Sequence, residues 1–371
     1  MVYFWGVSSY VSAVASCSDF GEVNMIYLDN ASTTRPQFFA EKYDDSWMNH
    51  NARYAYELQH VITDCRNRIK ECIGAKGGKI IFCRCATEAI EIVGRNFYQL
   101  ACSAKEHDCV WDNCNIHQDR WEYEGATQGY VCQLVNQLTG EYDFEIDKKG
   151  YFARSHDQYL ICDATAAIGK VEIPENLDDW CDALFFSCHK IHGPHIGVLW
   201  FGDRLCKAWG LSEDERNNYD FLHGTLDSSA VIAATDAIIA ATSDIDRKAD
   251  YYDKLLQTLV SELIRANIPH DLIGDSYDAA DYTSATNAIV LPGVNADSLQ
   301  QWLASKNCFI GIGASACSES HDYRVLCDGY NLSKQKAEQT IRVSFSMDND
   351  KQDVLDFVEY LKEYRNIFCE N

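Results

Sequence analysis

The chain has 371 residues, 47% of them hydrophobic and 24% charged, a globular composition that excludes disordered and low-complexity proteins. Its 32 basic and 56 acidic side chains give a net charge of −24, which repels nucleic-acid phosphates and anionic membrane surfaces. The 17 cysteines are too sparse for a disulfide scaffold, and no two have the CxxC spacing, so we expect reduced thiols in a cytoplasmic protein without a metal site.

The first 24 residues differ in texture from the rest of the chain. Residues 2–15 form an apolar run without a basic flank that ends in small residues, a pattern that also occurs in secretory signal peptides. The run is too short and too rich in serine to span a membrane, and Met25 directly precedes the first patterned segment. We interpret residues 1–24 as an N-terminal extension, with secretion as the alternative.

From residue 26 onward, short apolar runs alternate with helical patterns, which is typical of an α/β fold with a mostly parallel central sheet. Polar residues follow these runs, among them Asp163 and Ser187, at the strand ends where open α/β sheets bind ligands. The predicted strands are 79–83, 158–162, 183–186 and 197–201, and a predicted helix covers 86–100.

A long helical run from Ser229 to Asn267 leads out of this region. Beyond Pro269, shorter strands and helices indicate a small α+β unit with a predicted strand at 287–291, helix at 297–306, strand at 340–345 and closing helix at 350–368. The predicted boundaries are 1–24 for the extension, 25–245 for a large domain and 246–371 for a small C-terminal domain.

A lysine near the end of a predicted strand is the strongest local signal for chemistry. Lys190 follows the strand 183–186, and a partly desolvated lysine there can form a Schiff base. Asp163 ends the preceding strand, so the two side chains could meet over neighbouring strand ends, as the cofactor pyridoxal 5′-phosphate (PLP) requires. The alternatives are a solvated loop lysine and a helix N-cap at Asp163.

Two further segments suit a planar, phosphorylated ligand. Ala86 and Thr87 open a predicted helix, where free backbone N–H groups and a hydroxyl can bind a phosphate, although a capping box would also explain the threonine. His117 is a candidate to stack on a planar ring. A lone histidine is more often an ordinary surface or core residue.

The C-terminal half contributes an arginine and a cysteine. Arg342 lies inside an apolar strand, where its planar guanidinium suits an amino-acid carboxylate, with a structural salt bridge as the alternative. Cys317 lies in a loop of small residues, 311–320, where a thiolate can be exposed, and an inert thiol is the alternative.

In order, these segments resemble the PLP-dependent cysteine desulfurases of the class V aminotransferase family, which have fold type I. The resemblance runs from Ile26 to about Leu361, and it is carried by motifs in the family's order rather than by any single one. The motifs are YLDNASTTRP at 27–36, ATE at 86–88, the histidine at 117, VNQLTG at 135–140, DATAAIGK at 163–170, SCHKIHGP at 187–194, HGT at 223–225, ASACS at 314–318 and RVS at 342–344.

The resemblance implies contacts with PLP at the matching positions. Lys190 would hold the cofactor covalently, Asp163 would pair with its ring nitrogen and His117 would stack on its ring. The other implied cofactor contacts are Ala86, Thr87, Gln137, Ser187, His189 and, from the second subunit of a homodimer, Thr225.

For the reaction, the resemblance implies conversion of L-cysteine to L-alanine. Arg342, helped by Asn136 or Gln137, would bind the substrate carboxylate. Cys317 would attack the substrate sulfur, carry it as a persulfide and deliver it to an acceptor or scaffold protein, as in iron–sulfur cluster assembly.

The chain departs from the family's pattern at several positions. Ala166 stands where a glutamine usually contacts the PLP phenolic oxygen, Gln137 stands where an asparagine is usual, and Cys85 replaces a glycine. The interval from His117 to Asn136 is short for the family. Two alternatives therefore stay open: a class V lyase or aminotransferase acting on another amino acid, and a catalytically degenerate assembly partner.

Overall fold

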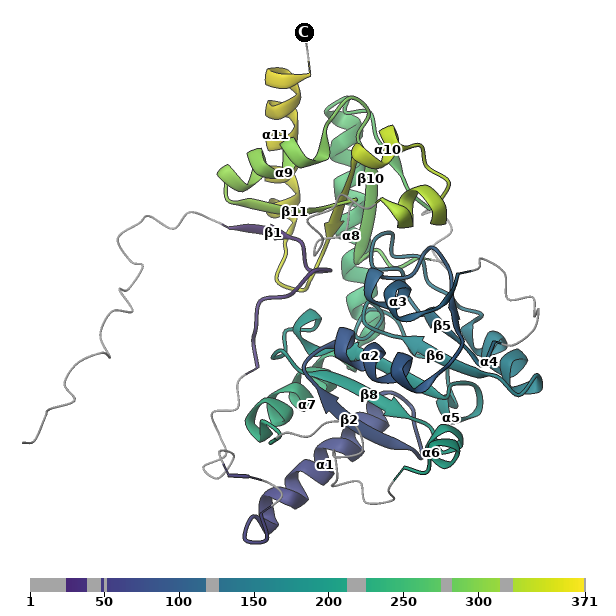
Figure 1. Cartoon of the computed structure of the whole chain (residues 1–371). Coiled ribbons are helices and arrows are strands. Elements are labelled where there is room, and N and C mark those ends of the chain that lie inside the picture. The colour runs from purple at the N-terminus through teal and green to yellow at the C-terminus, as the bar shows by residue number, and fades with distance from the viewer. Residues whose placement is uncertain are drawn as a thin grey trace, which may run out of the picture.

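The described residues form a larger body around a seven-stranded sheet and a smaller body around a five-stranded sheet (Figure 1). The large sheet is mostly parallel and is covered by helices on both faces, which confirms the predicted α/β fold. The computed structural model describes residues 25–38, 48–49, 52–117, 127–211, 225–274, 282–313 and 323–369.

The large sheet has the strand order β2-β8-β7-β6-β5-β3-β4, in which β8 runs antiparallel to both of its neighbours. Its central strands are buried on both faces, which explains why they appear in the sequence as continuous apolar runs. The strands are β2 (Lys79–Cys83), β3 (Leu100–Cys102), β4 (Ile116–His117), β5 (Gly129–Gln133), β6 (Tyr159–Asp163), β7 (Ala183–Ser187) and β8 (Gly197–Phe201).

Helices cover both faces of the large sheet. One face shares a hydrophobic core with α1 (Tyr56–Cys72) and α7 (Ser228–Thr242). The opposite face packs against α2 (Ala86–Asn96) and α3 (Asp108–Asn113). Three further helices belong to this body: α4 (Ile146–Ser155), α5 (Leu177–Trp180) and α6 (Asp203–Trp209).

The end of α2 differs from its prediction. The pattern predicts a helix up to residue 100, but α2 ends at Asn96 because Phe97 adopts an extended conformation, with φ −115° and ψ 138°. Leu100 then begins β3. A strand of three residues has no periodicity of its own, so its residues are easily assigned to the helix before it.

The predicted helical run from Ser229 to Asn267 is two helices with a bend of 71° between them. Asp244, in the left-handed conformation at φ 52°, precedes α8 (Ile245–Arg265). Because α7 packs in the large body and α8 turns its leucine stripe to the small body, the chain passes between the bodies at this bend. Among the described residues, no single helix is long and apolar enough to cross a membrane, and only the bent α7–α8 pair taken together reaches that length and apolarity.

The small sheet has the order β1-β11-β12-β10-β9, with β1 parallel to β11 and the other pairs antiparallel. Helix α8 and two further helices share its hydrophobic core. The side chain of Asp350 accepts from the backbone N–H groups of the first turn of α11 in a capping box with Asp353. The elements are β1 (Ile26–Leu28), β9 (Asp271–Leu272), β10 (Thr286–Val290), β11 (Cys308–Ile312), β12 (Thr340–Ser344), α9 (Ala296–Ser305), α10 (Lys334–Glu338) and α11 (Lys351–Phe368).

Strand β1 belongs to the small sheet, although the sequence pattern places residues 25–245 in one large domain. Tyr27 is paired with Phe309 of β11, across most of the length of the chain. Consecutive elements usually lie next to each other, so nothing in the local sequence indicates this remote pairing. The boundary between residues 245 and 246 stays a prediction.

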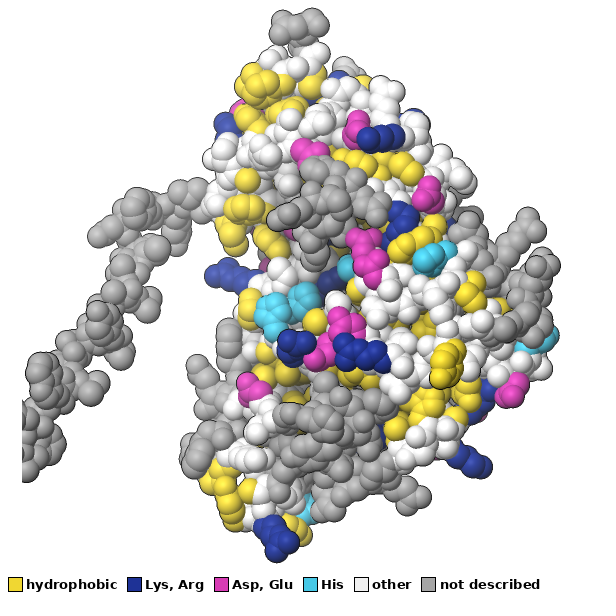
Figure 2. Space-filling view, in the orientation of Figure 1, with side chains coloured by type: hydrophobic (Ala, Val, Ile, Leu, Met, Phe, Trp, Pro, Cys, Tyr) yellow, Lys and Arg dark blue, Asp and Glu magenta, His cyan; other side chains and the backbone are white. Residues whose placement is uncertain are grey.

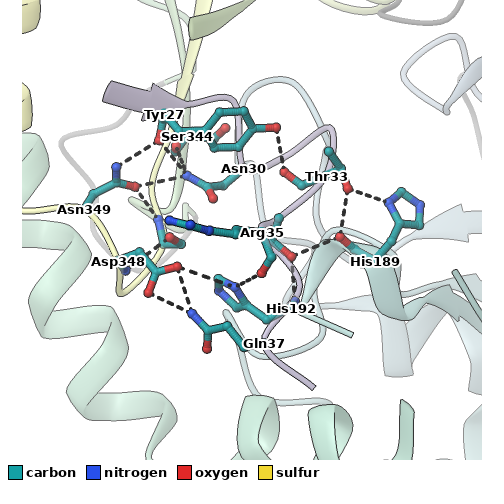
Figure 3. Close-up of polar contacts among 12 residues, drawn as sticks. Tyr27, Asn30, Thr33, Arg35, Gln37, His189, His192, Ser344, Asp348 and Asn349 are labelled. Carbon is teal, nitrogen blue, oxygen red and sulfur yellow. Dashed lines mark hydrogen bonds and ion pairs between the residues drawn. The ribbon is translucent and has the colours of Figure 1, made fainter. Parts of the chain in front are cut away.

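After β1, residues 29–38 run from the small sheet to the turn that follows β7, and we call them the N-terminal strap (Figure 3). At one end, Asn30 Nδ2 donates a hydrogen bond of 3.0 Å to the Ser344 carbonyl. At the other, the Thr34 N–H donates a 2.8 Å bond to the His189 carbonyl. The strap therefore ties the turn after β7 to the small body.

Candidate active site

A cavity of about 180 Å³ lies where the carboxyl ends of β6 and β7 meet the small body. In open α/β sheets, this edge is where ligands bind. Figure 2 shows histidine and charged side chains gathered on the surface at the junction of the two bodies. We therefore expect the residues that the sequence singles out to line this cavity.

Lys190 and Asp163 both line this cavity. Lys190 lies in a 3₁₀ turn (Cys188–Lys190) directly after β7, and Asp163 is the last residue of the adjacent parallel strand β6. Burial raises the pKa of Asp163 above its ordinary value, while the hydrogen bonds from Thr165 and the charge of Lys190 act in the opposite direction. The neighbouring strand ends thus bring an amine and a buried carboxyl group to one site.

The N-terminus of α2 forms another wall of the cavity. Its N-cap is Cys85, whose side chain makes no capping hydrogen bond, so the structure has no capping box at Thr87. The Ala86 N–H donates a 2.7 Å bond to Ser187 Oγ, and Thr87 and His189 also line the cavity. A helix N-terminus whose own N-cap residue makes no capping bond, next to hydroxyl groups, is suited to a phosphate.

His107 is a cavity residue that the sequence analysis missed. It is the N-cap of α3, and its Nδ1 accepts a 3.2 Å bond from the Cys109 N–H and lies 3.1 Å from Cys109 Sγ. Burial, helped by the charge of Lys190, lowers the pKa of His107 to about 4, and burial raises the pKa of Cys109 to about 12. The ring is therefore neutral, with Nδ1 as acceptor and its proton on Nε2.

His117 lies outside the cavity. Its ring is exposed and stacks on Trp111, with ring centroids 3.5 Å apart and an interplanar angle of 9°. His117 therefore does not line this cavity, whereas His107 does, and the stacking of a histidine on a cofactor ring stays a prediction. The missed signal is that His107 closely follows the end of β3, the short strand that the helical pattern concealed.

Arg342 forms a structural salt bridge and also lines the cavity. On β12, its Nη2 donates to Asp29 Oδ1 at 2.7 Å and to Ser32 Oγ at 2.6 Å, and its Nη1 donates to the Gln137 carbonyl at 3.2 Å. The guanidinium also lines the cavity, and its buried Nε has no hydrogen-bond partner in the described part of the chain. Arg342 is therefore held by the strap and still has a donor for an anion.

The structure separates the two residues of the 136–137 pair. Asn136 does not line the cavity: its Oδ1 accepts from the N–H groups of Leu138 and Thr139, which fixes a local turn. The contact of Asn136 with the substrate, which the resemblance implies, therefore has no support from this cavity and stays a prediction. Gln137 does line the cavity together with Ala166, and its buried Oε1 has no hydrogen-bond partner among the described residues.

Two predicted site residues, Thr225 and Cys317, are not among the described residues that line the cavity. Thr225 is exposed and does not line the cavity within this chain, and its predicted contact requires a second subunit. Cys317 lies outside the described residues. Gly313, which directly precedes that segment, and Val325, which lies shortly after it, both line the cavity.

The lining groups fit PLP, the cofactor that the family resemblance implies. Lys190 offers an amine for the PLP aldehyde, and Asp163 offers a buried carboxyl group for the ring nitrogen. The N-terminus of α2, whose N-cap residue makes no capping bond, suits the phosphate. The orphaned Oε1 of Gln137 leaves a buried polar atom for a ligand to satisfy. Ala166 supplies no side-chain donor.

Comparisons with known proteins identify the family and the fold of the chain. The family model for aminotransferase class-V matches residues 26–117 and 112–357. The probable mitochondrial cysteine desulfurase of Dictyostelium discoideum is 25% identical over 391 residues, covering 92% of this chain and 83% of its own. Among solved structures, a NifS-like protein of Rickettsia africae has a TM-score of 0.78 at 19% identity, covering 92% of this chain and 99% of its own. A cysteine desulfurase from Thermococcus onnurineus has a TM-score of 0.73 at 19% identity, covering 93% and 95% respectively, so both structures share the fold.

Proposed function

Because the chain belongs to the aminotransferase class-V family, we propose that it is a PLP-dependent cysteine desulfurase that converts L-cysteine to L-alanine. The observation that carries this proposal is that Lys190, Asp163 and Arg342 line one cavity. An amine, a buried carboxyl group and a guanidinium there match the needs of PLP and of an amino-acid carboxylate. The name of the Dictyostelium relative, a probable cysteine desulfurase, supports the choice of substrate.

PLP, when bound, supplies an electrophilic carbon and an electron sink for the reacting amino acid. Lys190 would hold the cofactor through its amine, and as a free amine it would take the proton from the substrate α-carbon. Asp163 would pair with the ring nitrogen and favour its protonated form. Arg342 binds the substrate carboxylate, and Asp29 fixes the orientation of its guanidinium.

Sulfur transfer is the step that we assign to Cys317. Its thiolate attacks the substrate sulfur, so that the carbon–sulfur bond breaks and a sulfur–sulfur bond forms. The electron pair of the broken bond stays on the substrate carbon, which takes a proton to give alanine. The persulfide on Cys317 then passes its outer sulfur to an acceptor protein.

We further propose that the enzyme acts as a homodimer in the cytoplasm and supplies sulfur for iron–sulfur cluster assembly. Thr225 would contact the cofactor phosphate of the partner subunit, which requires such a dimer. Each cysteine that the structure describes has a free thiol, which supports a reducing compartment. The net charge of −24 suits an acceptor with a basic surface.

Product analysis tests the proposed reaction. The protein reconstituted with PLP is incubated with L-cysteine and a reductant, and we expect alanine and sulfide in equal amounts. Pyruvate and ammonia would instead identify a lyase, and a keto acid formed only with an amino acceptor would identify an aminotransferase. A colourless protein without product after reconstitution would favour the degenerate assembly partner.

The two histidines provide a matched pair of variants. We expect His107→Ala to lower kcat/KM for cysteine by about 10²-fold, because its neutral ring faces the cavity. His117→Ala should leave kcat/KM within about twofold of wild type, since surface substitutions have small effects. Rates of sulfide release measure both. Equal losses in the two variants, or a loss confined to His117→Ala, would return the stacking role to His117.

A further inference from the structure

A second cavity, of about 200 Å³, borders Lys190. Lys190 is the one described residue that lines both this cavity and the candidate active site. Its walls come from the strap, the end of α7, the start of α8, the residues that follow β12 and the segment around Lys170. It is therefore a separate space between the two bodies, and we call it the strap cavity.

Lys170 is the unusual residue of the strap cavity. Its side chain is 7% exposed, and its Nζ has no hydrogen-bond partner among the described residues. Gly169, at φ +75°, lets the backbone lie against α7, because a Cβ there would meet Ala241 Cβ at 2.9 Å. The described part of the fold thus brings a buried amine into contact with a cavity and offers it no hydrogen-bond partner, which is costly unless a ligand supplies one.

None of the other charged or titratable groups that line the strap cavity forms a hydrogen bond with Lys170 in the described part of the chain. The carboxylate, Asp348, accepts two 2.8 Å bonds from Gln37 Nε2 and lies 3.8 Å from His192 Nδ1, as Figure 3 shows. Lys248 Nζ donates to the carbonyls at the end of α7, at 2.7 and 2.6 Å. Tyr252 and Lys190 complete the titratable lining, which therefore has an excess of cations.

The remaining walls of the strap cavity are mostly apolar. Ile168, Ala237 and Phe345 are buried and line it. An inorganic anion would satisfy Lys170 but would leave these side chains facing a hydrated ion. A ligand with one carboxylate and a short aliphatic tail matches both the amine and the apolar walls.

We propose that the strap cavity binds a small organic carboxylate, with its charge on Lys170 Nζ and its tail against Ile168, Ala237 and Phe345. This inference does not depend on the proposed desulfurase activity. An occupant would place a negative charge beside Lys190 and contacts on the strap, so its binding would act on the turn that carries the active-site amine.

The pH dependence of binding gives the first test. Burial, followed by the charges of Lys190 and Arg342, lowers the pKa of Lys170 to about 7. A bound carboxylate favours the charged amine, so binding takes up a proton and weakens by up to about tenfold per pH unit above neutrality. Calorimetric titration with butyrate at about pH 6 and about pH 8, in two buffers with different ionisation enthalpies, measures both effects.

Two probes and two variants locate the site. Butyramide, an uncharged analogue, and acetate, which lacks the tail, should both bind more weakly than butyrate.

Lys170→Met should weaken butyrate binding at least about tenfold and raise Tm, because it removes an unpartnered buried amine. Lys254→Met, the same change at an exposed position of α8, should leave binding intact. If Lys170→Met does not fold, Lys170→Gln replaces it. No butyrate binding, equal binding of butyramide, binding without proton uptake, or undiminished binding by the Lys170 variant would overturn the proposal.

Discussion

Replacing Lys190 by alanine lowers kcat for L-cysteine by at least about 10³-fold and abolishes covalent attachment of PLP. The loss is large because one amine both holds the cofactor and moves the substrate α-proton in the proposed reaction. Among the described residues, Lys190 is the one lysine that lines the candidate active site, and the buried Lys170 lines the strap cavity instead.

The measurement combines rates of alanine formation with the visible absorption of the bound cofactor and its fixation by borohydride. Lys254→Ala, on the exposed face of α8, is the control for loss of a lysine and should retain both properties. Fixation of the cofactor in Lys190→Ala at the level of wild type would mean that another lysine carries PLP. That result would remove the basis of the proposed site.

Cys317→Ala should reduce sulfide release from L-cysteine to the background rate while leaving the cofactor absorption unchanged. The physical reason is that Cys317 cannot lie far from the cavity. Gly313 lines the cavity, and the four residues from Gly313 to Cys317 span at most about 14 Å. In the proposed reaction nothing else receives the substrate sulfur.

Cys369→Ala, a change of the same kind near the end of α11, is the matched control and should keep wild-type rates. Persulfide on Cys317, detected by mass spectrometry of wild-type protein after a single turnover, completes the test. Full sulfide release by Cys317→Ala would argue against persulfide transfer and would favour the lyase alternative.

Much of the large body can be predicted because its central strands are buried on both faces. Continuous apolar runs mark β2 and β8 at their observed bounds, and polar residues mark where β6 and β7 end. Since parallel strands end at the same edge, these patterns also predict that Asp163 and Lys190 share a cavity. The position of Arg342 in an apolar strand likewise predicts a buried guanidinium with an anionic partner, here Asp29.

Two parts of the site are less visible in the sequence, for local physical reasons. Strand β3 is too short to show a period, so the sequence pattern does not mark the strand end that precedes His107. The resemblance implies that Asn136 helps to bind the substrate, whereas in the structure its side chain bonds to the backbone of its own turn, a frequent use of asparagine. The strap cavity could not be predicted, since it arises where residues far apart in the sequence meet.

The pairing of β1 with β11 also has a consequence for synthesis of the chain on the ribosome. Tyr27 emerges among the first described residues, whereas its neighbour Phe309 emerges only after most of the chain has been made. At bacterial or eukaryotic elongation rates, this interval is roughly 15–60 s. During that time β1 lacks its strand partner, so its backbone groups stay unpaired and the small body can close only near the end of translation.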